Sequence, residues 1–412
     1  MNYPSEAHEQ SSPYLIDPAY AAETPFPPPV DSHLWLYPRA EYECFLLSRM
    51  RRETAALKLN VGYPGAYHEP FDTTYFRKYV QPGSLVFGVN GTVDALFNSS
   101  SIEIIRGEGS DAAILTPFEG MLVLKVSVDD PALSVPAIKS SDDDWEASVD
   151  GISFSPAHRN AAPSGETLPV LDIPLTQLPS GSFDAGREVL AFLDVNSVDR
   201  PAIAVGESLY ELANRDDTQS EQSRDLVLVS ASHWRTPLPL AFRYASVTAA
   251  SPCSVSCQAV FSPACYRGAF HADPELDRIW MSSAYTLRLC MHHFILDGIK
   301  RDRLPWLGDL AISLMANAYT FAEGDFVKRT LAAIGRAGIK EQHLNGIIDY
   351  SLWYFVCHDR YQLYFDDHGF LSEQYREIKE ILLDILKIAE DNDGFLPDKS
   401  SWCFIDWVEC EK

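Results

Sequence analysis

The sequence predicts a multidomain protein in which an N-terminal antiparallel β-sandwich region is followed by a region of paired helical hairpins. Up to about residue 270, short apolar or alternating runs are separated by Gly, Pro, Asn and Asp, which is the pattern of antiparallel strands. After that point, apolar residues recur at helical spacing in five successive segments. Five helices in succession favour hairpins rather than a parallel α/β sheet.

The β-rich part is expected to contain two β-sandwich units, at 1–150 and 151–268. Alternating or apolar runs at 84–89, 120–128 and 225–229 predict strands. The stretch 131–182 is rich in Pro, Ser and Asp, and we expect it to link the two units. Its acidic run at 140–144 is expected to be a solvated loop, with metal binding as a remote alternative.

The helical part is expected to occupy 269–412. Asp273 is a predicted N-cap and Pro274 a predicted first helical residue, where its missing N–H has no intrahelical partner to lose. The periodicity then predicts a helix from 274 to about 294. Further helices are predicted at about 309–323, 326–337, 347–363 and 373–391.

The composition is that of a globular protein and argues against two classes of partner. The chain has 412 residues, of which 46% are hydrophobic and 12% aromatic, so it can form two or three domains with sizeable cores. Its 33 basic and 58 acidic residues give a formal net charge of −25, which repels nucleic-acid phosphates and anionic lipid surfaces. A neutral ligand such as a sugar is unaffected. The oligomeric state is not predicted.

The N-terminus and the cysteines indicate a cytoplasmic protein with reduced thiols. The first ten residues lack the basic and apolar regions of a signal peptide, and no later run approaches the roughly 20 apolar residues of a membrane helix. Eight cysteines are scattered along the chain, and none forms a CxxC pair. We therefore expect reduced thiols, no metal and no cofactor.

The segment 297–309 is the strongest candidate for a functional site. It places three carboxylates, three cations and a Trp in a loop between two predicted helices. Carboxylates accept hydrogen bonds from sugar hydroxyls, Arg donates to them in a fixed fork, and an indole face stacks on a pyranose. The alternative is structural: Asp297 and Asp309 cap helices, Asp302 pairs with a neighbouring Arg, and Trp306 is core. Spacing alone does not decide between them.

The order of several segments resembles the bacterial α-L-rhamnosidases. The segments 183–192 and 203–208 look like the β-sandwich part of that family, 280–288 like its first barrel helix, 297–309 like its catalytic-acid loop and 402–407 like a later sugar-contacting segment. The resemblance implies an (α/α)6 six-hairpin barrel, of which this chain holds the first part. It also implies hydrolysis of terminal α-L-rhamnosides with inversion and without a cofactor, using two carboxyl groups about 6.5–9.5 Å apart.

The resemblance assigns roles to seven residues. It makes Asp302 the general acid. It places four residues around the rhamnose and two less certain aromatic walls: Asp297, Arg301, Trp306 and Asp309; Trp353 and Trp407.

The chain departs from the family at two positions. Many relatives carry Glu where this chain has Asp302, which shortens the reach of the acid by one methylene. The family's catalytic base is a Glu expected beyond Lys412, and Glu409 and Glu411 are not assigned to that role. Two other readings therefore stay open: a non-catalytic or vestigial carbohydrate-binding protein, and a six-hairpin glycosidase of other sugar specificity.

Neighbouring charges add an expectation about the loop. A general acid must hold a proton near the working pH, whereas cations on either side of Asp302 keep it ionised. We therefore expect Arg301, Arg303 or both to turn towards Asp297, Asp309 or the sugar. His292 and His293 are expected on the preceding helix, about 100° apart, with one at the surface and the other buried with a partner.

Overall fold

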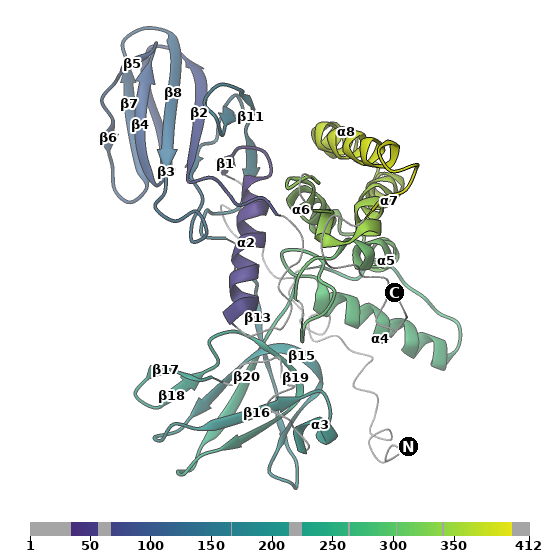
Figure 1. The fold of residues 1–412 in the computed structure, drawn as a ribbon. Helices are drawn as coiled ribbons and strands as arrows, with labels where there is room; N and C mark the ends of the chain where they lie inside the picture. Colours follow the sequence, from purple (N-terminus) through teal and green to yellow (C-terminus); the bar gives the residue numbers. More distant parts are fainter. Residues whose placement is uncertain are drawn as a thin grey trace.

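A computed structural model of the protein describes residues 34–56, 67–165, 167–213, 225–262, 264–301, 303–339 and 342–397. It places two β-rich units at opposite ends of helix α2 (Glu41–Ala56), and most of the remaining helices lie beside that helix (Figure 1). The predicted fold class, an antiparallel β region followed by a helical region, is confirmed.

The first unit is a sandwich of two six-stranded antiparallel sheets, with strand orders β12-β1-β9-β3-β7-β6 and β11-β10-β2-β8-β4-β5. Buried and exposed residues alternate along β4 and β8, so each strand turns one face to the core. The core includes Phe76, Leu122, Leu124 and Trp145. The strands are β1 (Trp35–Tyr37), β2 (Thr73–Val80), β3 (Gly83–Asn90), β4 (Thr92–Phe97), β5 (Ser100–Ser101), β6 (Ile105–Arg106), β7 (Asp111–Thr116), β8 (Gly120–Ser127), β9 (Ala137–Lys139), β10 (Glu146–Ser148), β11 (Ser155–Pro156) and β12 (His158–Asn160).

The prediction that 131–182 only links the two β-rich units is wrong, because this stretch contains strands of the sheets. It contributes β9 to β12 to the first two sheets, and β11 and β12 follow the expected division at residue 150. Strands of two or three residues are too short to show alternation, which is why the pattern did not reveal them.

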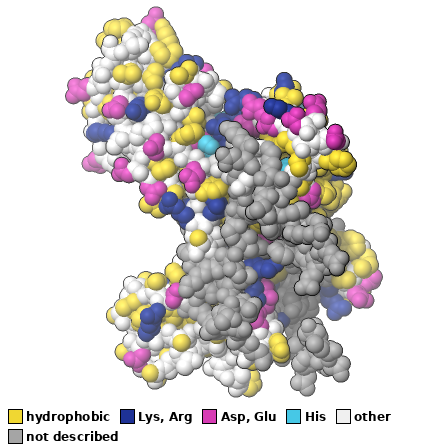
Figure 2. Space-filling model, in the orientation of Figure 1, with side chains coloured by type: hydrophobic (Ala, Val, Ile, Leu, Met, Phe, Trp, Pro, Cys, Tyr) yellow, Lys and Arg dark blue, Asp and Glu magenta, His cyan; other side chains and the backbone are white. Residues whose placement is uncertain are grey.

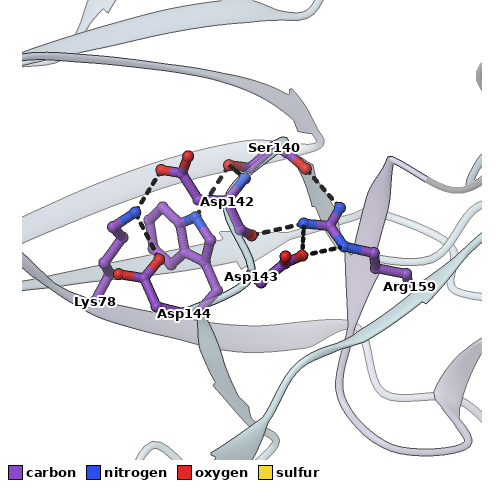
Figure 3. A network of polar contacts seen from close by, with 7 residues as sticks. Lys78, Ser140, Asp142, Asp143, Asp144 and Arg159 are labelled. Atoms are coloured by element: carbon purple, nitrogen blue, oxygen red, sulfur yellow. Dashed lines mark hydrogen bonds and ion pairs between the residues drawn. The ribbon is translucent and has the colours of Figure 1, made fainter.

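The acidic run is fixed by cations on two neighbouring strands (Figure 3). Lys78 of β2 contacts Asp142 and lies 2.6 Å from Asp144. Arg159 of β12 donates to Asp143 at 2.8 Å and to two backbone carbonyls of the run. The run is a loop with solvent-exposed carboxylates, as expected, and the two cations fix its conformation. Within the described ranges, no group of three or more His, Cys, Asp or Glu side chains is arranged to hold a metal ion.

The second unit is one eight-stranded antiparallel sheet that is organised by β15 (Phe183–Asn196). The register of β15 shifts between Asp184 and Val189, where Gly186 has a φ of 77° and its N–H donates to the Asp184 carboxylate at 2.7 Å. The other strands are β13 (Val170–Ile173), β14 (Thr176–Gln177), β16 (Ala202–Gly206), β17 (Val227–Ser230), β18 (His233–Arg235), β19 (Leu240–Thr248) and β20 (Ser254–Val260). A short helix, α3 (Leu209–Ala213), follows β16.

Helix α2 lies in the region where only strands were expected. Tyr42, Phe45, Leu46 and Met50 recur at helical spacing and are buried. The helix packs against α6, and its apolar residues share a core with Trp306. The helical signal was therefore present in the sequence, within a region that we assigned as a whole to strands.

The predicted C-terminal helices are confirmed with shifted ends. They are α4 (Pro274–Cys290), α5 (Leu307–Thr320), α6 (Gly324–Gly335), α7 (Ile348–Phe365) and α8 (His368–Glu390). The Asp273 side chain accepts from the N–H groups of Glu275 and Leu276, as the N-cap prediction requires. Charged side chains of both signs gather on the face of α8 that Figure 2 shows, although the helix also exposes apolar side chains such as Tyr375 and Leu383. In the part of the chain that the structure describes, no helix has the length and apolar character of a membrane span.

Candidate functional site

The loop between α4 and α5 closes on itself. Helix α4 ends at Cys290, four residues before the predicted end, because Met291 and Ile295 form a β-bridge and the Leu296 N–H donates to the Cys290 carbonyl at 2.9 Å. Further on, the Asp297 N–H donates to the Leu304 carbonyl at 3.2 Å. These contacts fix both ends of the loop.

Asp297 and Asp309 lie on the same side of the loop, next to Tyr350 and Cys290. Both carboxylates are half-buried, and the Tyr350 hydroxyl donates to Asp309 Oδ2 at 3.3 Å. Burial raises the pKa of Cys290 to about 12, with Asp297 and Asp309 adding to the shift, so both charges act at this point. Burial and the same two carboxylates also raise the pKa of Tyr350, which therefore keeps its proton and remains a donor.

Trp306 packs against Tyr350. Its ring is edge-on to that of Tyr350, with centroids 6.2 Å apart, and the residue is only 7% exposed. The indole is also part of the apolar core around α2. Trp306 is therefore a core residue, as the structural alternative expected, and its ring also contacts that of Tyr350.

Gly308 allows Tyr350 to approach α5. A Cβ atom at residue 308 would lie 2.6 Å from the Tyr350 ring, which is closer than side-chain atoms pack. A larger residue at 308 would therefore displace Tyr350 from Asp309.

Asn345 holds the start of α5 from a distant segment. The N-cap residue of α5 makes no side-chain cap of its own. Instead, Asn345 Oδ1 accepts from the Leu307 N–H at 3.0 Å, and its Nδ2 donates to the Pro305 carbonyl at 3.1 Å. Asn345 is fully buried with a φ of 54°, a conformation that Asn adopts more readily than most residues. It fixes the position of Asp309, which lies in the first turn of α5.

Two of the loop's cations face the second β-rich unit. Lys300 lies 2.7 Å from Glu211 and 3.2 Å from Glu207. Arg303 is buried and donates to the carbonyls of Ile299 and Pro239, the latter at 2.8 Å. The hydrogen bonds recorded for Arg303 thus go to backbone carbonyls and not to Asp297 or Asp309. Its turning away from Asp302 stays a prediction, because Asp302 lies outside the described residues.

A neutral carboxyl group lies at the same interface. Burial, followed by the neighbouring charge of Glu207, raises the pKa of Glu188 to about 8, although Lys300 opposes the shift. At neutral pH Glu188 therefore holds a proton, and Lys300 pairs with Glu207 and Glu211.

The structure describes five of the seven predicted site residues. It brings together Asp297, Asp309 and Trp306, whereas Arg301 is exposed at the turn of the loop. Trp353 lies on α7 one turn after Tyr350 and is 39% exposed, so its indole has a free face. Asp302 and Trp407 lie outside the described residues, as does the whole 402–407 segment.

The two adjacent histidines follow α4 instead of lying on it. His292 donates to the Leu289 carbonyl at 2.8 Å, and burial lowers its pKa to about 4. His293 is buried, with Arg49 at 3.1 Å from its Nε2. Neither histidine touches the Asp297–Asp309 pair in the contacts that the structure records.

Tyr350 and Asn345 were not predicted. Both come from segments more than 35 residues after the loop, and nothing in their local sequence indicates where they dock. The aromatic-rich start of α7 was a weak signal, because an amphipathic aromatic residue near a carboxylate is a common ligand contact. Together the described residues offer carboxylate acceptors, a tyrosine hydroxyl and an exposed indole, which is an arrangement able to bind polyhydroxylated ligands.

Comparison with known proteins finds a match for the helical region. Residues 268–412 match the family model of the bacterial alpha-L-rhamnosidase 6 hairpin glycosidase domain. A search of curated proteins found no match.

Three solved structures are similar in part. A rhamnosidase from Klebsiella oxytoca with rhamnose bound has 24% identity and a TM-score of 0.43, and the match covers 50% of this chain and 48% of that chain. A GH78 family rhamnosidase of Bacillus sp. GL1 has 14% identity and a TM-score of 0.43, with 81% of this chain and 46% of that chain covered. An α-L-rhamnosidase from Aspergillus terreus has 15% identity and a TM-score of 0.41, with 76% of this chain and 51% of that chain covered. The chain spans about half the length of these proteins.

Proposed function

From this rhamnosidase-like helical region, we propose that the chain binds the terminal α-L-rhamnosyl group of a glycoside and takes part in its hydrolysis with inversion. The observation that supports the proposal is the grouping of Asp297 and Asp309 around Tyr350, inside the residues that match the family domain. The two carboxylates are acceptors for sugar hydroxyls, and their half-buried position strengthens each hydrogen bond.

The proposed roles follow from position. Asp302 protonates the leaving glycosidic oxygen as general acid. Arg301, exposed at the turn, donates to the sugar, while Trp306 supports the site through its contact with Tyr350. The aromatic walls are Trp353 and Trp407. No residue of this chain is assigned as the catalytic base.

Sugar binding is the first test of this function. Isothermal titration calorimetry with L-rhamnose is expected to give a dissociation constant in the millimolar range, and D-glucose is expected to bind much more weakly. Asp309→Asn and Tyr350→Phe should each weaken L-rhamnose binding about tenfold, or about 1.4 kcal/mol. The first change replaces a charged acceptor by a weaker neutral one, and the second removes a hydroxyl group. The matched control is Asp325→Asn, on an exposed carboxylate of α6. Equal affinity for both sugars would contradict the proposal.

Turnover is the second test. The 412-residue chain is expected to release p-nitrophenol from p-nitrophenyl α-L-rhamnoside very slowly, because only the acid of the carboxyl pair is assigned to it. Asp302→Asn should abolish that release while L-rhamnose binding persists. Turnover near that of complete glycosidases would show that a base lies within the chain. Binding with no release at all would favour the non-catalytic alternative.

A further inference from the structure

A cavity lies between the first sandwich and helix α8, which face each other in Figure 1. We call it the interdomain pocket. Strands β10 and β11 and the segment between them form one wall, and the residues before α2, the end of α6 and the first half of α8 form the other. Its volume of about 640 Å³ lies within the usual range of about 300–1,000 Å³ for small-molecule sites, so it has room for a ligand with two rings.

The charged side chains of the interdomain pocket already have partners of opposite charge. Each arginine that lines it has a carboxylate within ion-pair distance: Arg39 with Glu377 at 2.7 Å, Arg336 with Glu41 at 3.5 Å and Arg376 with Glu380 at 3.7 Å. The Asp150 carboxylate accepts from two backbone N–H groups of its own loop. A charged ligand would lose hydration without finding a free counter-charge, so a ligand without charge is the better match.

His158 and Glu373 join the two walls of the pocket. Nδ1 of His158 in β12 lies 3.3 Å from Oε1 of Glu373 in α8. Burial lowers the pKa of His158 and raises that of Glu373, so each group is shifted towards its uncharged form. This contact therefore adds no excess charge to the pocket.

The ion pairs leave hydrogen-bonding capacity unused. Among the described residues, no hydrogen bond is recorded for the side chains of Arg39, Arg336 and Glu377, although each side chain is partly accessible. A buried polar atom without a hydrogen bond costs about 1–3 kcal/mol. A guanidinium only donates and a carboxylate only accepts, whereas a hydroxyl group does both. A neutral ligand with several hydroxyl groups can therefore bond to all three side chains.

Apolar side chains line the same pocket. They include Pro38, Phe154 and Pro156. The ring of Phe154 is held by Arg77, whose Cζ lies 4.2 Å from the ring centroid. A pyranose ring carries hydroxyl groups at its edge and apolar C–H groups on its faces, so it matches a pocket that offers both kinds of surface.

We propose that the interdomain pocket binds two consecutive neutral sugar rings, as in a disaccharide. Their hydroxyl groups accept from Arg39 and Arg336 and donate to Glu377, and one C–H face lies against Phe154. The ligand then contacts both the sandwich and α8, so its binding stabilises the folded chain. This binding does not depend on the proposed rhamnoside hydrolysis, because the described lining residues include none from the loop between α4 and α5.

Calorimetry on the unmodified chain tests the proposal with neutral and charged probes. The neutral probes are cellobiose, maltose, lactose and trehalose. Digalacturonate carries a net charge, and the dipeptide alanylglycine carries two separated charges. We expect at least one neutral disaccharide to bind in the millimolar range or tighter, and about tenfold or more tightly than either charged probe. No binding of any neutral probe in that range, or equal binding of a charged probe, would overturn the proposal.

Two variants of α8 locate the binding. Ser372→Trp fills the pocket from an exposed position and should abolish disaccharide binding. The matched control is Leu383→Trp, at an exposed position of α8 outside the pocket lining, which should not change it. Thermal unfolding checks that each variant is folded. Unchanged disaccharide binding by a folded Ser372→Trp protein would refute the interdomain pocket.

Two further variants test the hydrogen bonds and separate the two sites. Glu377→Gln keeps the size of the side chain and replaces a charged acceptor by a weaker neutral one, so it should weaken disaccharide binding about tenfold. Asp309→Asn should weaken L-rhamnose binding and leave disaccharide binding unchanged. Weaker disaccharide binding by Asp309→Asn would place the disaccharide at the loop and overturn the proposal. Disaccharide binding by a chain that does not bind L-rhamnose would support the pocket and contradict the proposed function.

Discussion

The two β-rich units differ in how their cores are completed. The interior of the first sandwich is formed by residues of its own strands and loops, such as Leu124 and Trp145. The core of the second sheet also takes in Tyr285 and Leu289 of α4 and Ile299 of the loop before α5. The second sheet therefore shares a core with the candidate loop, whereas the interior of the first sandwich contains no residue of that loop. The first unit reaches the loop only from its edge, where Tyr37 and Ala137 share a core with Trp306 among the described residues.

Truncation of one core residue in each unit should give the largest effects. Leu124→Ala and Ile299→Ala each remove a buried aliphatic side chain, so each should lower the free energy of unfolding by about 3 kcal/mol. Only Ile299→Ala should also weaken L-rhamnose binding. Chemical denaturation and calorimetry measure the two quantities. If Leu124→Ala weakened binding equally, the distinction between the two units would be lost.

Loss of the Asn345 side chain should have the next largest effect. Asn345→Ala leaves the Leu307 N–H and the Pro305 carbonyl buried without their partner, which should cost about 2 kcal/mol. L-rhamnose binding should weaken with it. The matched change is Asn90→Ala in the first sandwich, where Asn90 donates to Val135 at 2.9 Å. Asn90→Ala should lower the free energy of unfolding, measured by denaturation, and leave the affinity for L-rhamnose, measured by calorimetry, unchanged. Weaker L-rhamnose binding by Asn90→Ala would contradict the prediction.

Glycine substitution should give a smaller effect. Gly308→Ala forces the Tyr350 ring away from α5, so it should weaken L-rhamnose binding several-fold and lower the free energy of unfolding by about 1 kcal/mol. Gly88→Ala, in the first sandwich, places a Cβ 2.7 Å from that of Lys139 and serves as the control. The control should cost similar stability without changing affinity. Unchanged affinity in Gly308→Ala would show that Tyr350 does not contact the sugar.

Substitution of Glu188 should change stability only at high pH. The pKa of Glu188 is about 8 when folded against 4.5 for a free side chain, so the folded state holds the proton more tightly. Stability from this group is full below pH 4.5 and is lost as the pH rises through 8. Glu188→Gln should therefore raise Tm by several °C at pH 8.5 and leave it unchanged at pH 4, since each unit of a pKa shift corresponds to about 1.4 kcal/mol. Glu103→Gln, on an exposed position of the sandwich, should change neither value, and a Tm gain there would argue against burial as the cause.

The sequence predicted those structural features that depend on contacts between residues close together in the chain. Asp273 and Pro274 specify the start of α4 through a cap made within three residues. The end of α4 was missed because the Met291 bridge to Ile295 is a contact outside the helix. Strands β9 to β12 were missed because they gain their stability from partners far along the chain.

In the candidate site, too, local features could be predicted and contacts between distant segments could not. The loop composition predicted that Asp297 and Asp309 act together, and both affect Cys290 and Tyr350 in the structure. Tyr350, Asn345 and the carboxylates that hold Lys300 could not be predicted, because each reaches the loop through the tertiary fold. The roles of Asp302 and Trp407 stay predictions, since both residues lie outside those described.

The cap that Asn345 provides has a consequence for biosynthesis. The partner of the Leu307 N–H lies 38 residues further along the chain. At a synthesis rate of about 5–20 residues per second, the ribosome needs roughly 2–8 seconds to add that stretch. During this interval the first turn of α5 must remain solvated or be sheltered by a chaperone, so the loop acquires its final shape late in translation.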